Sequence, residues 1–363
     1  MTRRLEIMLV ASAVALSLAW PAPSHAQEHT WKFAVSGDSR NCGDVVMPAI
    51  AAGVKQAGAE FYWHLGDLRM THDIDQDLAH QPEHLAATLT KAEYQAIEWD
   101  DFTQSQMVPF GGIPFYLGIG NHETVAPKDR AAFVAQFAQQ LDLPNLRAQR
   151  LKDDPSDTAP KSYYHWIEHG VDFFNLDNST KNQFDAEQVE WFEKTLTRDA
   201  NNARIRTFVI GMHEALPESL AKNHAMDQTP EGVQSGLRVY ADLLGIQKRK
   251  HKRVYVLASH SHYFMDGTFN SDYWHAHGGV LPGWIVGTAG AVRYKLPPDS
   301  SRARAAQTDV YGFLLGTVGS RGRIQFDFQR INESDVPRAI TSRYTPEFVH
   351  WCFAENSEAH PTK

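Results

Sequence analysis

Residues 31–38 read WKFAVSGD, a strand-like run that ends in a glycine and an acidic residue. Residues 60–67, EFYWHLGD, repeat this pattern, and the sequence between the two runs predicts a helix over residues 45–57. Three more strand-like runs also end in polar side chains, over residues 114–119, 205–210 and 253–258. Strands that alternate with helices indicate an α/β protein whose chemistry lies on loops at the strand ends.

The strand ends carry side chains that bind divalent metal ions. They are Asp38, Asp67, Asn121, His213, His260 and His262. Glycines beside several of them let the backbone turn sharply. Because strands joined by helices gather their loops at one edge of a sheet, we expect these six side chains to form one cluster. Their carboxylate, amide and imidazole groups suit manganese, iron or zinc.

Five short blocks, each following a strand-like run, resemble the calcineurin-like metallophosphoesterase superfamily. In order they are Gly37-Asp38, Gly66-Asp67, Gly120-Asn121-His122-Glu123, His213 and His260-Ser261-His262. The resemblance extends over about residues 33–288. It implies a four-layer α/β/β/α sandwich that holds two divalent metal ions. It also implies an enzyme that hydrolyses a phosphate mono- or diester with metal-activated water.

The resemblance assigns a role to each residue of the blocks. Asp67 is expected to bridge the two metal ions, and His122 to be a catalytic residue that stabilises the transition state or protonates the leaving oxygen. The remaining ligands fall into two groups, Asp38 and His262 for the first metal and Asn121, His213 and His260 for the second.

The pattern breaks at Arg40. Most members of the superfamily have a histidine at this position, and purple acid phosphatases have a tyrosine where this chain has Met70. Arginine stays protonated and is not an ordinary metal ligand, so the first site is predicted to be weak, empty or completed by a neighbour such as Asn41. Two interpretations of Arg40 are open: it binds a phosphate oxygen of the substrate, or it forms a salt bridge with Asp44 or another nearby acid.

The rest of the chain is assigned more coarsely. Residues 71–107 are predicted to be a helical insertion over the rim of the site, and residues 185–197 a helix capped by Asp185. Residues 30–330 are expected to form the metallophosphoesterase domain, and residues 331–363 a C-terminal tail without clear periodicity. Further strands are predicted over residues 284–287, 311–318 and 323–328.

The N-terminus predicts export. Residues 1–26 combine Arg3 and Arg4, an apolar stretch over residues 7–20 and a small-residue site that ends at Ala26, as in a cleaved signal peptide. A retained membrane anchor is the alternative, but the stretch is shorter than a membrane span requires. We therefore expect a periplasmic or secreted protein with no membrane span after cleavage.

Two cysteines follow the predicted signal peptide. Cys42 lies four residues after Asp38, and Cys352 lies near the C-terminus. An exported protein allows them to pair, which would tether the tail close to the site, but two free thiols are equally compatible with the sequence.

The charge of the chain limits its partners. The formal net charge is −8, so no overall positive field favours nucleic acid, and the basic run over residues 248–253 fits a helix end. We expect a small-molecule phosphate ester as the partner, and no nucleic acid; the sequence predicts no oligomeric state. The rival function is that of a degenerate, non-catalytic member that only binds a metal or ligand, and Arg40 is its best support.

Overall fold

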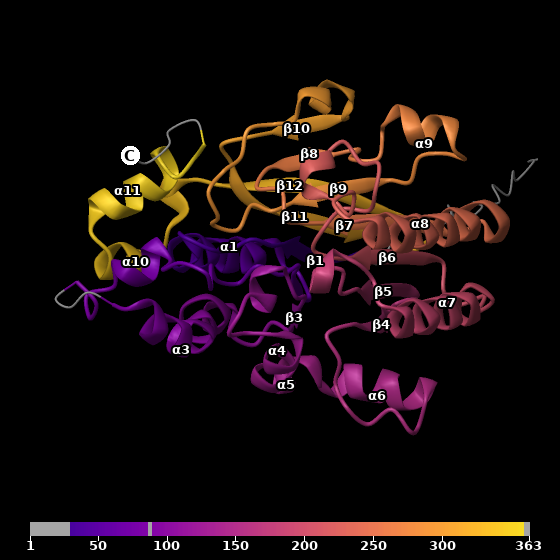
Figure 1. Cartoon of the computed structure of the whole chain (residues 1–363), viewed down its shortest axis with the longest axis horizontal. Coiled ribbons are helices and arrows are strands. Elements are labelled where there is room, and N and C mark those ends of the chain that lie inside the picture. The colour runs from indigo at the N-terminus through magenta and orange to yellow at the C-terminus, as the bar shows by residue number, and fades with distance from the viewer. Residues whose placement is uncertain (1–29, 86–88, 359–363) are drawn as a thin grey trace, which may run out of the picture.

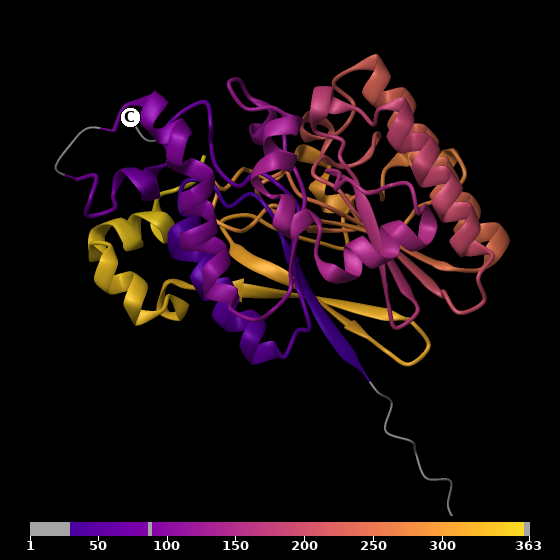
Figure 2. The same ribbon diagram turned by 90° about the horizontal axis from the view of Figure 1, so that it is seen from below.

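The computed structural model describes residues 30–85 and 89–358, and it contains two mixed β-sheets that pack face to face (Figures 1 and 2). The five-stranded sheet has the order β12 (Ile324–Ile331), β11 (Tyr311–Val318), β1 (Trp31–Ser36), β2 (Tyr62–His64) and β3 (Phe115–Leu117). The seven-stranded sheet has the order β10 (Ala305–Gln307), β8 (Phe264–Asp266), β9 (Gly283–Val286), β7 (Arg253–Ala258), β6 (Thr207–Gly211), β5 (Val171–Asn175) and β4 (Tyr164–Glu168).

Helices cover the outer face of each sheet. Helix α1 (Gly43–Ala57) packs on β11 and β12 of the first sheet, and α8 (Pro230–Lys250) packs on β7 of the second, beside α7 (Ala186–Ala200). Within the described residues, the remaining α-helices of five or more residues are α3 (Lys91–Asp101), α4 (Arg130–Gln136), α6 (Pro144–Asp153), α9 (Asp272–Ala276), α10 (Arg338–Arg343) and α11 (Pro346–Ala354). The predicted α/β/β/α sandwich is therefore confirmed.

Aromatic side chains fill the space between the two sheets. Phe33 and Phe61 from the first sheet meet Phe173 from the second, with ring centroids 5.1 and 5.3 Å apart, and Trp166 stacks on Tyr116 at 4.1 Å. These five side chains are at most 3% exposed. Burial of this apolar surface holds the sheets together and so fixes the distance between the loops at their edges.

Parallel pairing brings the chemically important strand ends to one edge. Strands β1, β2 and β3 are parallel to one another, as are β5, β6, β7 and β9. The two sheets also meet at this edge, where the Gly37 amide donates a hydrogen bond to the Val286 carbonyl (3.1 Å). Loops from both sheets consequently face one shared space.

Strands β4 and β5 were not predicted. They form an antiparallel hairpin whose turn places His169 and Gly170 at positive φ. All five residues of β5 are buried, including Asp172. A fully buried strand shows no polar alternation, and so its sequence carries a weak signal.

The predicted insertion packs against α1, while its first residues lie beside the site, where the His72 ring lies 4.8 Å from that of His122. Helix α2 (Gln76–Ala79) and the π-helix η1 (Phe102–Met107) contact α1. Arg69, fully buried, forms ion pairs with Asp44 of α1 (2.6 Å) and Asp77 of α2 (2.8 Å). This buried network holds the insertion on the outer helix layer.

The segment after residue 331 contains helices α10 and α11, which are too short for a clear periodicity. Cys352 of α11 forms a disulfide with Cys42, the residue that precedes α1, with their Cα atoms 5.8 Å apart. Arg293 further binds this segment by donating hydrogen bonds to the carbonyls of Phe353 and Asn356. The cysteines are therefore paired, and the C-terminal segment is tied to the loop that carries Asp38.

The predicted signal peptide, residues 1–26, lies outside the described residues. Within the part of the chain that the structure does describe, no helix is both long and apolar enough to cross a bilayer.

Breaking the disulfide tests how much it stabilises the fold. The bond joins residues 310 positions apart, so its loss frees a large loop in the unfolded state. We expect Cys352→Ser to lower the free energy of unfolding by about 2–5 kcal/mol, measured by urea titration. Cys42→Ser and the double variant should match it, and an unchanged midpoint in all three would contradict the prediction.

Candidate metal centre

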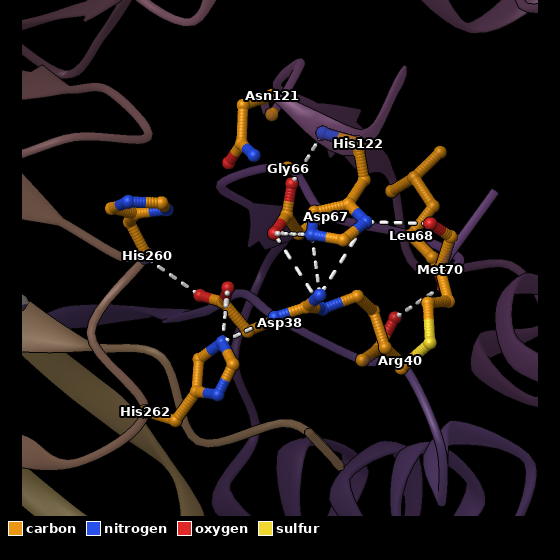
Figure 3. A network of polar contacts seen from close by, with 12 residues as sticks. Asp38, Arg40, Gly66, Asp67, Leu68, Met70, Asn121, His122, His260 and His262 are labelled. Carbon is orange, nitrogen blue, oxygen red and sulfur yellow. Dashed lines mark hydrogen bonds and ion pairs between the residues drawn. The ribbon is translucent and has the colours of Figure 1, made fainter. Parts of the chain in front are cut away.

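All six predicted ligands lie together at the shared edge of the sheets, and Figure 3 labels five of them, all but His213. The first sheet supplies Asp38 after β1, Asp67 after β2 and Asn121 after β3, and the second supplies His213 after β6, with His260 and His262 after β7. Two groups of ligand atoms, each within 4.8 Å of one another, share Asp67. One group contains Asp38 and His262, and the other His213 and His260.

Several of these residues have a strained backbone. Asp38, Asp67 and His260 have φ values of 60°, 58° and 63°, in the left-handed region that non-glycine residues seldom adopt. A Cβ atom at Gly120 would collide with the carboxylate of Asp67. Strain of this kind persists where the surrounding structure enforces it, and it is typical of functional sites.

The second ligand group brings electron pairs together around one point. The Nε2 atom of His213 lies 3.0 Å from Asn121 Oδ1, 3.0 Å from His260 Nδ1 and 3.3 Å from Asp67 Oδ1. Neighbouring ligands at about 2.1 Å from one ion are separated by roughly 3 Å, as these atoms are.

A hydrogen bond to the backbone orients His213 for this role. Its Nδ1 donates to the Leu65 carbonyl (3.0 Å), which leaves the Nε2 lone pair of the neutral ring for a cation. The other oxygen of Asp67, Oδ2, is buried and accepts no hydrogen bond within the described residues. The donor set around His213 Nε2 fits a divalent metal ion, whereas the charged group that faces Asp67 Oδ2 is Arg40, 3.6 Å away.

The first ligand group already contains a cation from the protein. His262 Nε2 lies 3.1 Å from Asp38 Oδ1, but it also accepts a hydrogen bond from Arg40 Nη2 (2.8 Å). Arg40 Nε lies 3.6 Å from Asp67 Oδ2, and the residue is only 7% exposed. The Asp44 side chain is instead occupied by Arg69, so the acid that faces Arg40 is Asp67.

His122 lies on the other side of the Arg40 guanidinium. Its Nδ1 donates to the Met70 carbonyl (2.6 Å), and its Nε2 accepts from Arg40 Nη1. Burial, with Arg40 acting in the same direction, lowers the pKa of His122 to about 4. His122 is therefore neutral at neutral pH, and its free lone pair is held by Arg40.

The pKa values of the residues in the second ligand group also indicate that a positive charge is needed there. Burial would lower the pKa of His213, but Asp67 raises it to about 10. Burial would raise the pKa of Asp67, but His213 and Arg40 are among the charges that hold it well below its usual value. Burial and His213 keep the pKa of His260 well below its usual value. Either a proton on His213 or a metal ion can balance the carboxylate, and the two compete.

Three neighbours were not singled out from the sequence as functional. The Tyr294 ring stacks on His262, with centroids 3.9 Å apart, and His224 stacks on Tyr294 at 5.0 Å. Glu123 lies within a quoted block but received no role. Its carboxylate accepts hydrogen bonds from the backbone amides of Asp67 (2.9 Å), Leu68 (2.9 Å) and Gly120 (2.7 Å). It thus joins the loops after β2 and β3.

Removal of the Glu123 carboxylate tests this role. Glu123→Ala leaves three buried amides without an acceptor, so we expect the free energy of unfolding to fall by about 3 kcal/mol or more. Because the loop that carries Asp67 is then less well held, affinity for Mn²⁺ should fall by about 10–100-fold in calorimetric titration. Glu60→Ala, at an exposed position, is the matched control. Equal Mn²⁺ affinities in both variants would contradict the prediction.

A separate cluster of ionisable groups lies on the β4–β5 hairpin. His165 hydrogen-bonds to Asp172 through Nδ1 (2.8 Å) and to Asp153 through Nε2, and Arg198 pairs with Asp153 at 2.9 Å. Both ring nitrogens of His165 thus face carboxylates, and two cations balance the acids. We interpret this cluster as an ion-pair network that stabilises the hairpin.

This network predicts a loss of stability at alkaline pH. Burial would lower the pKa of His165, but Asp172 and Asp153 raise it to about 9, above its unfolded value. Its stabilising effect is therefore complete below about pH 6.5 and is lost as the pH rises through 9. The free energy of unfolding of the wild type minus that of His165→Asn should fall by roughly 2 kcal/mol between pH 6.5 and 9.5. A difference that does not change with pH would contradict this assignment.

Solved structures with a similar fold include a purple acid phosphatase and PhoD. A purple acid phosphatase from yellow lupin (Lupinus luteus) seeds gives a TM-score of 0.54 at 16% identity, over 84% of this chain and 52% of that chain. PhoD gives a TM-score of 0.50 at 13% identity, over 84% of this chain and 72% of that chain. This chain thus spans about half the length of the lupin enzyme.

At these identities the likeness shows the fold alone. The chain has the calcineurin-like metallophosphoesterase fold, as the ordered blocks indicated. The sequence itself matches no family model and no curated protein sequence.

Proposed function

We propose that this chain is a metal-dependent phosphoesterase that hydrolyses a phosphate mono- or diester. The observation that carries the proposal is the convergence of Asp67, Asn121, His213 and His260 around one point, at the edge of a metallophosphoesterase fold. In such a site a bound divalent ion lowers the pKa of water and offsets charge on phosphoryl oxygens. The ion could be manganese, iron or zinc, because the ligands are oxygen and imidazole nitrogen.

Residues of the chain have further roles in the proposed reaction. Asp67 holds negative charge in a buried position, and Arg40 beside it supplies a fixed positive charge. We propose that Arg40 also binds a phosphoryl oxygen of the substrate, since its two terminal nitrogens have more N–H groups than the hydrogen bonds they donate to His122 and His262. Such a local cation is needed because the chain has a net charge of −8.

His122 is the proposed catalytic residue beside the substrate. In the free protein burial, together with Arg40, keeps the pKa of His122 low and the ring neutral. A phosphate group placed against Arg40 adds negative charge next to the imidazole, which favours its protonation. His122 could then stabilise the developing charge or give a proton to the leaving oxygen.

The alternative function is ligand binding without catalysis. It is favoured by one observation, namely that Arg40 occupies the first ligand group where the resemblance expects a metal ion. The second ligand group and His122 favour catalysis, because binding alone does not require both.

We also propose that the protein is exported, to the periplasm or beyond the cell. The signal-like residues 1–26 support this, and so does the Cys42–Cys352 disulfide, since disulfides persist in oxidising compartments.

Turnover of generic phosphate mono- and diesters tests the proposed function. We expect metal-loaded wild type to hydrolyse at least one ester class, chelation to abolish this activity, and added metal to restore it. Asp67→Asn and His213→Ala should each lower kcat/KM by about 10³-fold or more, because both weaken the site that holds the metal. His122→Ala should lower kcat while the metal content stays unchanged.

Matched controls separate loss of the site from loss of the fold. Asp327→Asn on the exposed side of β12 and His350→Ala on α11 make the same chemical changes away from the centre. Both controls should retain wild-type activity. If metal-loaded wild type is as inactive as His122→Ala towards every ester class, the enzymatic function is excluded and the ligand-binding alternative is favoured.

A further inference from the structure

Arg40 occupies the space between the ligands of the first group. Its Nη2 atom donates to His262 Nε2 at 2.8 Å, and its Nε atom lies 3.6 Å from Asp67 Oδ2. Asp38 Oδ1 lies 3.1 Å from the same His262 nitrogen (Figure 3). We infer that the Arg40 guanidinium takes the place of a metal ion here, so that this chain holds a single metal ion, at Asp67, Asn121, His213 and His260.

The hydrogen bonds of His262 leave no electron pair for a metal. Its Nδ1 faces the Val292 carbonyl at 2.7 Å, and a carbonyl can only accept, so this nitrogen carries the proton. With the proton on Nδ1, the ring nitrogen that could bind a metal is Nε2, where the Arg40 N–H already points. A metal ion could bind His262 only if the guanidinium moved away.

The chain on both sides of Arg40 opposes such a movement. The Ser39 amide donates to the Asp67 carbonyl (2.9 Å), and the Asn41 amide donates to Asp75 Oδ1 (2.7 Å). Two residues after Arg40, Cys42 is bonded to Cys352. With its backbone anchored and its side chain buried, Arg40 has few other positions for its charge.

Charge gives a second reason for exclusion. A guanidinium and a divalent ion a few ångströms apart repel strongly, the more so where water is largely excluded. Arg40 already supplies a positive charge to the carboxylates of Asp38 and Asp67, among which a first metal ion would lie. The guanidinium stays protonated at neutral pH, and its charge does not depend on the supply of metal.

The second group has no such cation of its own. Within the described residues, no arginine or lysine hydrogen-bonds to the ligand atoms of Asn121, His213 or His260, and His213 Nε2 faces only electron-pair donors. The two groups therefore differ: a metal ion fits the second, and the protein has filled the first.

This inference rests on the proposed function in one respect: the single ion is the one that the proposed ester hydrolysis requires. Metal counting tests it without any substrate. The full chain is stripped with chelator, reloaded with excess Mn²⁺ and desalted, and manganese per chain is measured by mass spectrometry and by electron paramagnetic resonance. Wild type should hold one ion with the spectrum of isolated Mn²⁺.

Variants locate that ion. His213→Ala should lower the count from one to none, whereas Asp38→Asn should leave it at one, because Asp38 belongs to the Arg40 group. Arg40→Ala should raise the count to two, with a spin-coupled spectrum. The double variant Arg40→Ala/Asp38→Asn should return it to one.

Three results would overturn the inference: two ions in wild type, loss of the single ion in Asp38→Asn but not in His213→Ala, or a folded Arg40→Ala that still holds one. If Arg40→Ala does not fold, the wild-type and Asp38→Asn counts decide. One ion per chain without ester hydrolysis would refute the proposed function and leave this inference standing. Two ions per chain with ester hydrolysis would refute this inference and leave the proposed function standing.

Discussion

The structure depends on one constraint: two carboxylates, those of Asp38 and Asp67, are buried, and the protein supplies too few cations to balance their charge. Asp38 and Asp67 are fully buried, and they lie in a space where the lone pairs of several imidazoles also converge. Such a space is costly unless positive charge fills it. Arg40 lies among the ligands of the first group, and the second group requires a proton or a metal ion to balance its charge.

The scaffold around this space keeps the ligands in place. Glu123 joins the loops after β2 and β3 through backbone amides, and Gly120 admits the Asp67 carboxylate. The disulfide of Cys42 secures the loop after β1. Packing of aromatic residues between the sheets then sets the distance between the carboxylates of one sheet and the imidazoles of the other. The site is therefore a product of the whole sandwich and not of one loop.

Much of this was predictable from the sequence, because the strand-end blocks are local signals. The runs ending at Asp38, Asp67 and Asn121 predicted both the strands and their common edge, as did the paired histidines 260 and 262. The hairpin of β4 and β5 was missed because β5 is buried on both faces. The role of Glu123 was missed because its partners are backbone amides, which no residue pattern reveals.

The position of the Arg40 side chain is likewise beyond local sequence signals. Its partners His122 and His262 are 82 and 222 residues away, so only the assembled fold decides where it points.

Anomalous X-ray diffraction from crystals of the manganese-loaded chain tests the central claim most directly. The account predicts one strong anomalous peak bounded by Asp67, Asn121, His213 and His260, with Arg40 still hydrogen-bonded to His262. A lack of any peak among these four side chains, with manganese present in the crystal, would contradict it.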